Sequence, residues 1–177
     1  VTEPVIVTIT GESAEPAAQH IVIEAGTNSR ALVVLRHVGS AVLSQNVEFS
    51  VADGANLTVV SLQEWDDDSV HASSQQASLG RDATFKHVLV SLGGDLVRVT
   101  PSTRFTAPGG DVEMYGLTFV DDGQQRLRVG FADGGLHRDD DAMARLVLDG
   151  GPRLAGAQRR RAHDDIAEQP LVLEPPA

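Results

Sequence analysis

A short turn pattern recurs at nearly constant spacing through the first two thirds of the chain. Four glycines, at positions 26, 54, 80 and 109, are each followed two residues later by Asn or Asp and then by a small or apolar residue. The glycines are 28, 26 and 29 residues apart, and a β-branched run follows each turn. Glycine adopts positive φ freely, and Asn and Asp tolerate the left-handed region. Self-similarity at this period predicts stacked repeats, with an ordinary β-sandwich as the alternative.

The repeating units read as strands rather than helices. Runs rich in Val, Ile, Thr and Phe occur throughout residues 1–122, each bounded by Gly, Asp, Asn or Pro. Val47, Phe49 and Val51 alternate with polar residues, which is the period of a strand buried on one face. We therefore expect an all-β parallel β-helix (β-solenoid) with coils of about 26–29 residues. Its expected strands are 5–9, 21–23, 31–35, 47–51, 57–62, 85–92, 96–99 and 112–120.

Composition excludes several classes of function. The 177 residues contain no cysteine, which removes thiolate metal ligands, a cysteine nucleophile and disulfides. The net charge of −11 argues against binding to nucleic-acid phosphates, which requires Lys and Arg. No segment approaches the roughly 18 uninterrupted apolar residues of a membrane span. We expect a cytoplasmic protein that binds neither nucleic acid nor membrane.

The character of the chain changes near residue 122. Residues 1–122 carry 16 acidic and 6 basic side chains, whereas residues 123–177 carry 9 acidic and 8 basic ones. The second part is rich in Gly, Ala, Arg, Asp and Pro. We expect 1–122 to be the β-helix core and 123–177 to be a divergent, irregular tail, either poorly ordered or forming extra coils. Residues 142–148 are compatible with a strand or with two helical turns.

An acidic cluster, Glu64 with Asp66, Asp67 and Asp68, is a candidate for calcium binding or carboxylate catalysis. Consecutive side chains of an extended chain point in alternating directions, so the three aspartates cannot all converge on one ligand. We predict a solvated loop between coils. Trp65, within this cluster, is expected at the rim of that loop, as a core or interface residue.

Other candidates carry no clear chemistry. The six histidines lack the spacing of a metal face within one element, although stacking of coils would bring His71 or His87 against a neighbour. We predict hydrogen-bonded or surface histidines. Gly93–Gly94 lacks the Lys-Ser/Thr of a phosphate loop and is expected to be a strand-end turn. Arg159–Arg161 is expected to be solvated. No catalytic, cofactor-binding or metal-binding residue is assigned.

Residues 46–124 resemble a known family. Four pieces of the sequence occur in the family's order and spacing. They are Asn46–Glu64, Gln76–Phe85, the Gly-Gly-x-x-x-Arg of residues 93–98, and Gly109–Leu117 followed by Asp122-Gly-Gln124. This ordered set is similar to the core of the SufB/SufD family of iron–sulfur cluster assembly proteins, and most like its SufD members. Residues 1–39 resemble the family more weakly.

The resemblance implies a right-handed parallel β-helix that acts as a scaffold and is not an enzyme. Family members of the SufD type pair with a SufB-like β-helix protein and with a SufC-like ATPase. We therefore expect those two partners, and self-association through the open β-helix ends. No cofactor is expected on this chain alone; an iron–sulfur cluster would be held only through the complex, because no thiol is present.

The resemblance stops after Gln124. The family's late histidine and its C-terminal helices that hold SufC have no matching positions, so no binding residue is carried over. Either the gene diverges here or residues 125–177 are read from a shifted frame, which the coding DNA would decide. We expect the chain to be the middle of a longer β-helix. The alternatives are a β-helical carbohydrate-active enzyme, for which one Trp and one Tyr offer a poor substrate platform, and a structural β-domain without activity.

Overall fold

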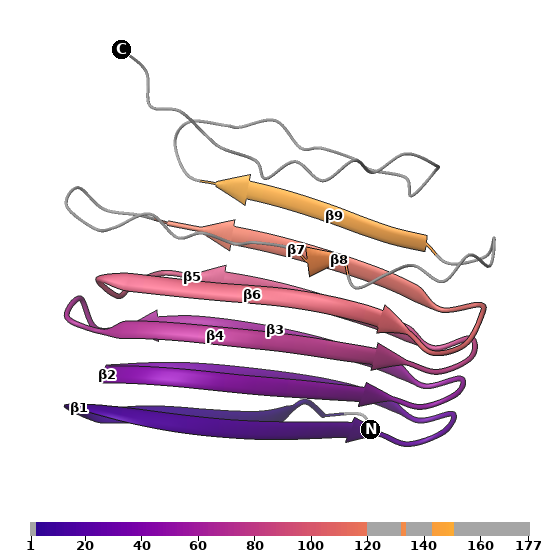
Figure 1. Ribbon diagram of the computed structural model, residues 1–177, viewed down its shortest axis with the longest axis horizontal. Coiled ribbons are helices and arrows are strands. Elements are labelled where there is room, and N and C mark those ends of the chain that lie inside the picture. Colours follow the sequence, from indigo (N-terminus) through magenta and orange to yellow (C-terminus); the bar gives the residue numbers. More distant parts are fainter. Residues whose placement is uncertain (1–2, 120–131, 134–142, 151–177) are drawn as a thin grey trace, which may run out of the picture.

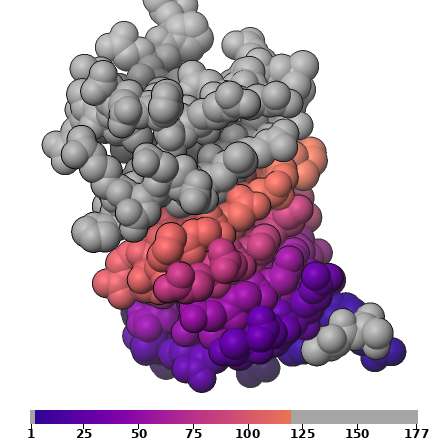
Figure 2. Space-filling model, turned by 90° about the vertical axis from the view of Figure 1, so that its right-hand side faces the viewer, coloured from indigo at the N-terminus to yellow at the C-terminus, as the bar shows by residue number. Residues whose placement is uncertain are grey.

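The computed structural model describes residues 3–119, 132–133 and 143–150, which form a flattened parallel β-solenoid (Figure 1). All paired strands run parallel. The coils stack in sequence order from the N-terminal end upward (Figure 2). The strands are β1 (Val5–Ala25), β2 (Arg30–Val51), β3 (Asn56–Trp65), β4 (Val70–Leu79), β5 (Thr84–Ser91), β6 (Leu96–Phe105), β7 (Asp111–Thr118), β8 (Ala132–Asp133) and β9 (Met143–Gly150).

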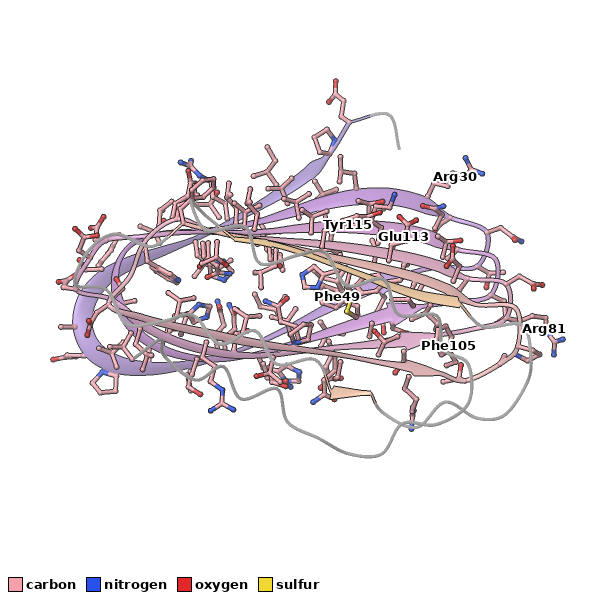
Figure 3. All side chains as sticks on the ribbon, turned by 90° about the horizontal axis from the view of Figure 1, so that it is seen from above. Arg30, Phe49, Arg81, Phe105, Glu113 and Tyr115 are labelled. Atoms are coloured by element: carbon pink, nitrogen blue, oxygen red, sulfur yellow. The ribbon has the colours of Figure 1, made fainter. Side chains whose placement is uncertain are left out.

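Each coil contributes to two sheets that face one another across the core (Figure 3). The long strands β1 and β2 bend and take part in both sheets. In the first, which we call the β3 sheet, the first halves of β1 and β2 pair onward with β3, β5, β7 and β9. In the second, the β4 sheet, their second halves pair onward with β4, β6 and β8. The expected parallel β-solenoid is confirmed.

The register gives the coil length directly. Arg30 pairs with Asn56, Val42 with Val70 and Thr84 with Asp111, so one coil takes 26, 28 or 27 residues. Between β7 and β9 the step lengthens, because Asp111 pairs with Met143. Residues 143–150 form a strand, and β8 and β9 pair with β6 and β7. The described residues beyond 122 therefore continue the two sheets.

The recurring turn has a steric explanation. Asn28 and Asp82 adopt φ of 57° and 51°, and Gly54 and Gly109 adopt φ of 65° and 80°. A Cβ built on Gly54 would overlap the Asn28 side-chain oxygen, and one on Gly109 would overlap that of Asp82. The Asx side chain of one coil thus lies against the glycine of the next. Gly54 and Gly109 are needed because the coil below leaves no room there for a Cβ, whereas a Cβ on Gly26, in the first turn, would meet nothing within 4 Å.

The interior is apolar at both ends and polar between them. Near the turns, Phe49 and Phe85 pack with ring centroids 5.3 Å apart in a cluster with Leu35, Leu57 and Leu79. A smaller cluster near the opposite bend contains Leu43, Leu89, Val97, Val99 and Trp65. Trp65 is 3% exposed, so its expected place at the rim of a loop is wrong. It ends β3 at an inward position and is part of the core.

Strand β4 was not among the expected strands. Its sequence, Val-His-Ala-Ser-Ser-Gln-Gln-Ala-Ser-Leu, has one β-branched residue, Val70, whereas the expected strands are rich in them. Its inward positions nevertheless alternate strictly with its outward ones, and the inward side chains are buried. These inward residues, His71, Ser73 and Gln75, belong to the polar region described next.

Candidate functional site

Eight buried polar side chains occupy the middle of the solenoid, and we call them the polar layer. They come from β2, β3, β4 and β5, and all lie at inward positions that elsewhere carry Val, Leu or Phe. None exceeds 5% exposure. The members are His37, Gln45, Ser61, Gln63, His71, Ser73, Gln75 and His87.

Hydrogen bonds join the polar layer into one connected chain. His87 Nε2 lies 3.0 Å from Ser61 Oγ, which donates to Gln75 Oε1 at 3.2 Å. Gln75 Nε2 lies 3.5 Å from Ser73 Oγ, which donates to Gln45 Oε1 at 3.3 Å. Gln45 Nε2 donates in turn to Gln19 Oε1 of β1 at 2.7 Å. Since a buried polar group costs free energy unless it is paired, the connected chain is what makes a polar interior tolerable.

Gln63 holds the other end of the polar layer together. Its Nε2 donates to His37 Nδ1 at 3.2 Å, while its Oε1 accepts from Trp65 Nε1 at 3.0 Å and lies 2.8 Å from His71 Nδ1. Trp65 Nε1 also lies 3.1 Å from His71 Nδ1, so this ring nitrogen contacts both a carbonyl oxygen and an N–H group. Among the described residues, His71 Nε2 is buried and has no hydrogen-bond partner.

The three rings at this end pack against one another. The His37 and His71 centroids are 5.0 Å apart, and Trp65 lies 5.4 Å from His37 and 5.3 Å from His71. Burial lowers the pKa of His71 to about 3, helped by the nearby His37, and burial lowers that of His87 to about 4. Burial also lowers the pKa of His37, against the opposing hydrogen bonds from Gln45 and the Leu62 backbone. All three histidines are therefore neutral at pH 7.

The buried histidines predict acid sensitivity. Their pKa values are lowered on folding, so the unfolded chain binds more protons below its ordinary pKa of about 6.5. We expect the free energy of unfolding to fall between pH 6.5 and pH 5 by up to about 1.4 kcal/mol per pH unit for each histidine. Urea titrations across this range measure it, and His87→Gln should reduce the slope by about a third. A stability that is flat between pH 6.5 and 5 would contradict the buried neutral state.

The residues singled out from the sequence lie in different places. Asp66, Asp67 and Asp68 are exposed at the bend between β3 and β4, as predicted, and Ser40 Oγ donates to Asp68 at 2.7 Å. Glu64 forms an ion pair with Arg36 on the outer surface. Gly93–Gly94 form the bend between β5 and β6, also as predicted. Arg159–Arg161, His137 and His163 lie outside the described residues.

His71 and His87 are buried and hydrogen-bonded, which is one of the two predicted outcomes. Stacking of coils brings His71 close to His37, a residue that sequence reasoning did not single out. Within the described ranges, no three His, Asp or Glu side chains lie close enough together to hold a metal ion. One signal in the sequence could have found the polar layer: polar residues at alternate positions of a strand, on the same face as apolar core residues. Gln63 is an example, because it lies two residues before Trp65 and both point inward from β3.

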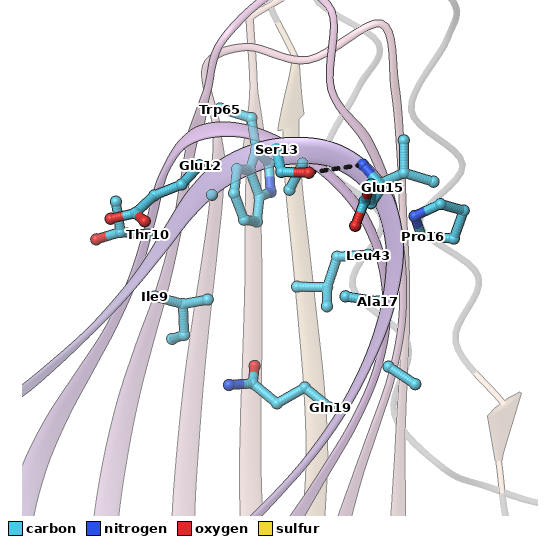
Figure 4. Close-up of a pocket in the computed structure, with 14 residues that line it drawn as sticks. Ile9, Thr10, Glu12, Ser13, Glu15, Pro16, Ala17, Gln19, Leu43 and Trp65 are labelled. Carbon is cyan, nitrogen blue, oxygen red and sulfur yellow. Dashed lines mark hydrogen bonds between the residues drawn. The ribbon is translucent and has the colours of Figure 1, made fainter.

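A hollow of about 440 Å³ lies beside Trp65, at the bend of the first coil (Figure 4). Apolar side chains of β1 and β2, among them Ile9, Pro16 and Leu43, line it together with Gln19. Glu12 and Glu15 also line it. Gln19 connects the two features, because it lines the hollow and accepts a hydrogen bond from Gln45 of the polar layer.

Comparison with known proteins identifies the family. The chain matches the family described as "SUF system FeS cluster assembly, SufBD core domain" over residues 7–129, a range that contains seven of the solenoid's strands almost whole. The chain belongs to the SufBD core family. The expected membership of the SufB/SufD family is confirmed at this level, and the matching description does not separate SufD from SufB.

Curated SufBD relatives support the same assignment. The chain is 45% identical over 125 residues to an iron–sulfur cluster assembly SufBD family protein of Mycobacterium bovis, 44% identical to one of Mycobacterium tuberculosis and 43% identical to one of Mycobacterium leprae. These alignments cover 70% of this chain but 32% of each relative. The chain thus spans about a third of the length of these relatives.

No solved structure matches the chain. Among the residues that the structure describes, no helix is long and apolar enough to cross a membrane.

Proposed function

We propose that this chain is a non-catalytic, SufD-like scaffold segment of the iron–sulfur cluster assembly machinery, and that it works in the cytoplasm. The observation that supports this most is the coincidence of the SufBD core match, residues 7–129, with the solenoid. A stack of parallel coils offers long, rigid edges and faces but few mobile loops, and such a shape suits assembly with other proteins.

The proposed partners are a SufB-like β-helix protein and a SufC-like ATPase. The first and last coils of a solenoid present unpaired backbone N–H and C=O groups, which a strand of a similar protein can satisfy. Among the described strands, the edge of β1 that does not pair with β2 is of this kind. The chain contributes no thiol, so in this proposal any iron–sulfur cluster bound by the complex takes its sulfur ligands from a partner.

Co-purification tests the proposal. The chain, tagged and coexpressed with the SufB-like and SufC-like proteins of the same genome, should capture both through affinity and size-exclusion steps. A tagged, unrelated β-solenoid of similar charge is the control, because it offers the same kind of open edge. If the chain captures neither partner although it is folded, the scaffold proposal is wrong and an isolated structural domain is the better interpretation.

A further inference from the structure

The two outer faces of the solenoid differ in composition. Outward positions of the β4 sheet are mostly small and polar: Ser44, Asn46, Glu48, Ser50, Ala72, Ser74, Gln76, Ser78, Arg98, Thr100, Ser102 and Arg104. Its apolar outward residues include Val22 and, near the bend, the row Val42, Val70 and Leu96. The β3 sheet instead carries a continuous outward column in which Ile6, Val34, Val60, Val88 and Tyr115 are partners in register. Beside it, Leu62, Val90 and Leu117 form a second row. We call these eight side chains the apolar strip.

The apolar strip does not serve the core, because other residues of the same strands fill the interior. Leu57, Val59, Phe85 and Val112 point inward from β3, β5 and β7 and are buried. The strip continues toward the bend through Leu92 and Phe119, which are 44% and 51% exposed. A row of apolar side chains, four aliphatic and one aromatic, on the outside of five consecutive coils is a feature of surfaces that meet a partner.

Charges on this face cancel within the face itself. Arg36 pairs with Glu64, and Lys86 Nζ lies 2.6 Å from Glu113. Lys86 also lies 5.8 Å from the centre of the Tyr115 ring. The whole chain carries a net charge of −11, and the bend with Asp66–Asp68 would repel a second copy. The β3 sheet face is therefore a surface on which two copies can approach without net repulsion.

The area suits a pair of identical chains. Five strands about 4.8 Å apart, each about eight residues long at about 3.3 Å per residue, make a face of about 600 Å². Two such faces would bury about 1,200 Å² in total, the lower end of the range for specific interfaces. Flat sheets pack face to face at about 10 Å with interdigitating aliphatic side chains, as in β-sandwiches.

We infer that a second copy of this chain packs on the apolar strip, β3 sheet against β3 sheet. The contact is a two-fold one, since the same strip is used on both copies. It differs from pairing through the open coil ends and does not depend on the proposed scaffold function. It leaves the outer face of the β4 sheet free.

Two lysines placed in the strip test the inference. The full chain should have the mass of a dimer by size exclusion with light scattering at tens of micromolar protein. Val60→Lys with Val88→Lys should yield the monomer mass with an unchanged circular dichroism spectrum, because buried lysines oppose association. Gln76→Lys with Ser102→Lys, also neighbours in register but on the β4 sheet face, should stay dimeric. A monomeric wild-type chain, or a dimer that survives the Val60 and Val88 changes, overturns the inference.

Cross-linking offers a second readout that does not depend on stability. The chain has no cysteine, so a single introduced thiol reports only its own position. With a short bis-maleimide, Val60→Cys should give a covalent dimer in high yield, whereas Ser74→Cys on the opposite face should give several-fold less. Equal yields from the two variants, or no cross-linking at Val60, would contradict packing through the strip.

Discussion

Replacement of Gly39 by alanine should destabilise the solenoid by about 3 kcal/mol, among the largest effects of any single methyl group in this chain. Gly39 pairs with Gly11 in the coil below and has a φ of 81°, in the left-handed region. A Cβ at Gly39 would overlap the backbone carbonyl oxygen of Gly11. Because that oxygen belongs to a hydrogen-bonded strand, it cannot move aside as a flexible side chain would.

Gly26→Ala is the matched control. Gly26 lies in a turn of the same solenoid, but a Cβ there meets nothing within 4 Å, and its φ is not positive. We expect a change within about 0.5 kcal/mol, or a slight gain from the reduced freedom of the unfolded chain. Urea unfolding followed by circular dichroism gives both values. Equal stability of the two variants would contradict the close contact between the backbones of Gly11 and Gly39.

Replacement of Gln63 by leucine should cost about 1–3 kcal/mol, although leucine fits an inward position of a strand. Gln63 is fully buried, and three side chains bond to its amide: His37, Trp65 and His71. Its removal takes one hydrogen bond from each of these side chains, while Trp65 Nε1 and His71 Nδ1 keep their 3.1 Å contact with each other. A polar atom left without a partner in the core costs about 1–3 kcal/mol. A single substitution to a more hydrophobic residue is thus predicted to destabilise the core.

Gln76→Leu is the control for the polar layer. Gln76 lies in β4 at an exposed outward position, and its side chain donates only to Ser74. The same exchange of Gln for Leu should change the free energy of unfolding by less than about 0.5 kcal/mol. If Gln63→Leu is as stable as Gln76→Leu, the polar layer is not a connected network and the arrangement around Gln63 is wrong.

Much of the fold follows from local sequence chemistry. The spacing of the four turn glycines predicts the coil length, because three of them, Gly54, Gly80 and Gly109, lie against an Asn or Asp side chain of the coil below. The alternation of Val47, Phe49 and Val51 predicts which side chains face the core, and all three are buried. Both signals are properties of a few neighbouring residues, so they are visible in a single sequence.

The polar layer could not be predicted in the same way. His71, Ser73 and Gln75 give β4 the composition of a loop, and only contacts across coils and between sheets make their burial favourable. The partners of a buried histidine lie 8 or 26 residues away in sequence, as Gln45 and Gln63 do for His37. Trp65 was misplaced for the same reason, since its neighbours His37 and His71 come from other strands.

The polar layer also bears on how the family match is interpreted. The SufBD core match covers the strands that carry all eight of its members. Its three neutral histidines leave the interior uncharged, and the described residues offer no cluster of metal ligands. The family match therefore coincides with a stacked, uncharged interior.

Native mass spectrometry of the chain coexpressed with the SufB-like and SufC-like proteins of its genome tests the scaffold role most directly. The scaffold role predicts a single complex whose mass contains all three proteins, with iron present in the complex and absent from this chain alone. A chain that stays separate from both proteins, while those two assemble with each other and with iron, would contradict it.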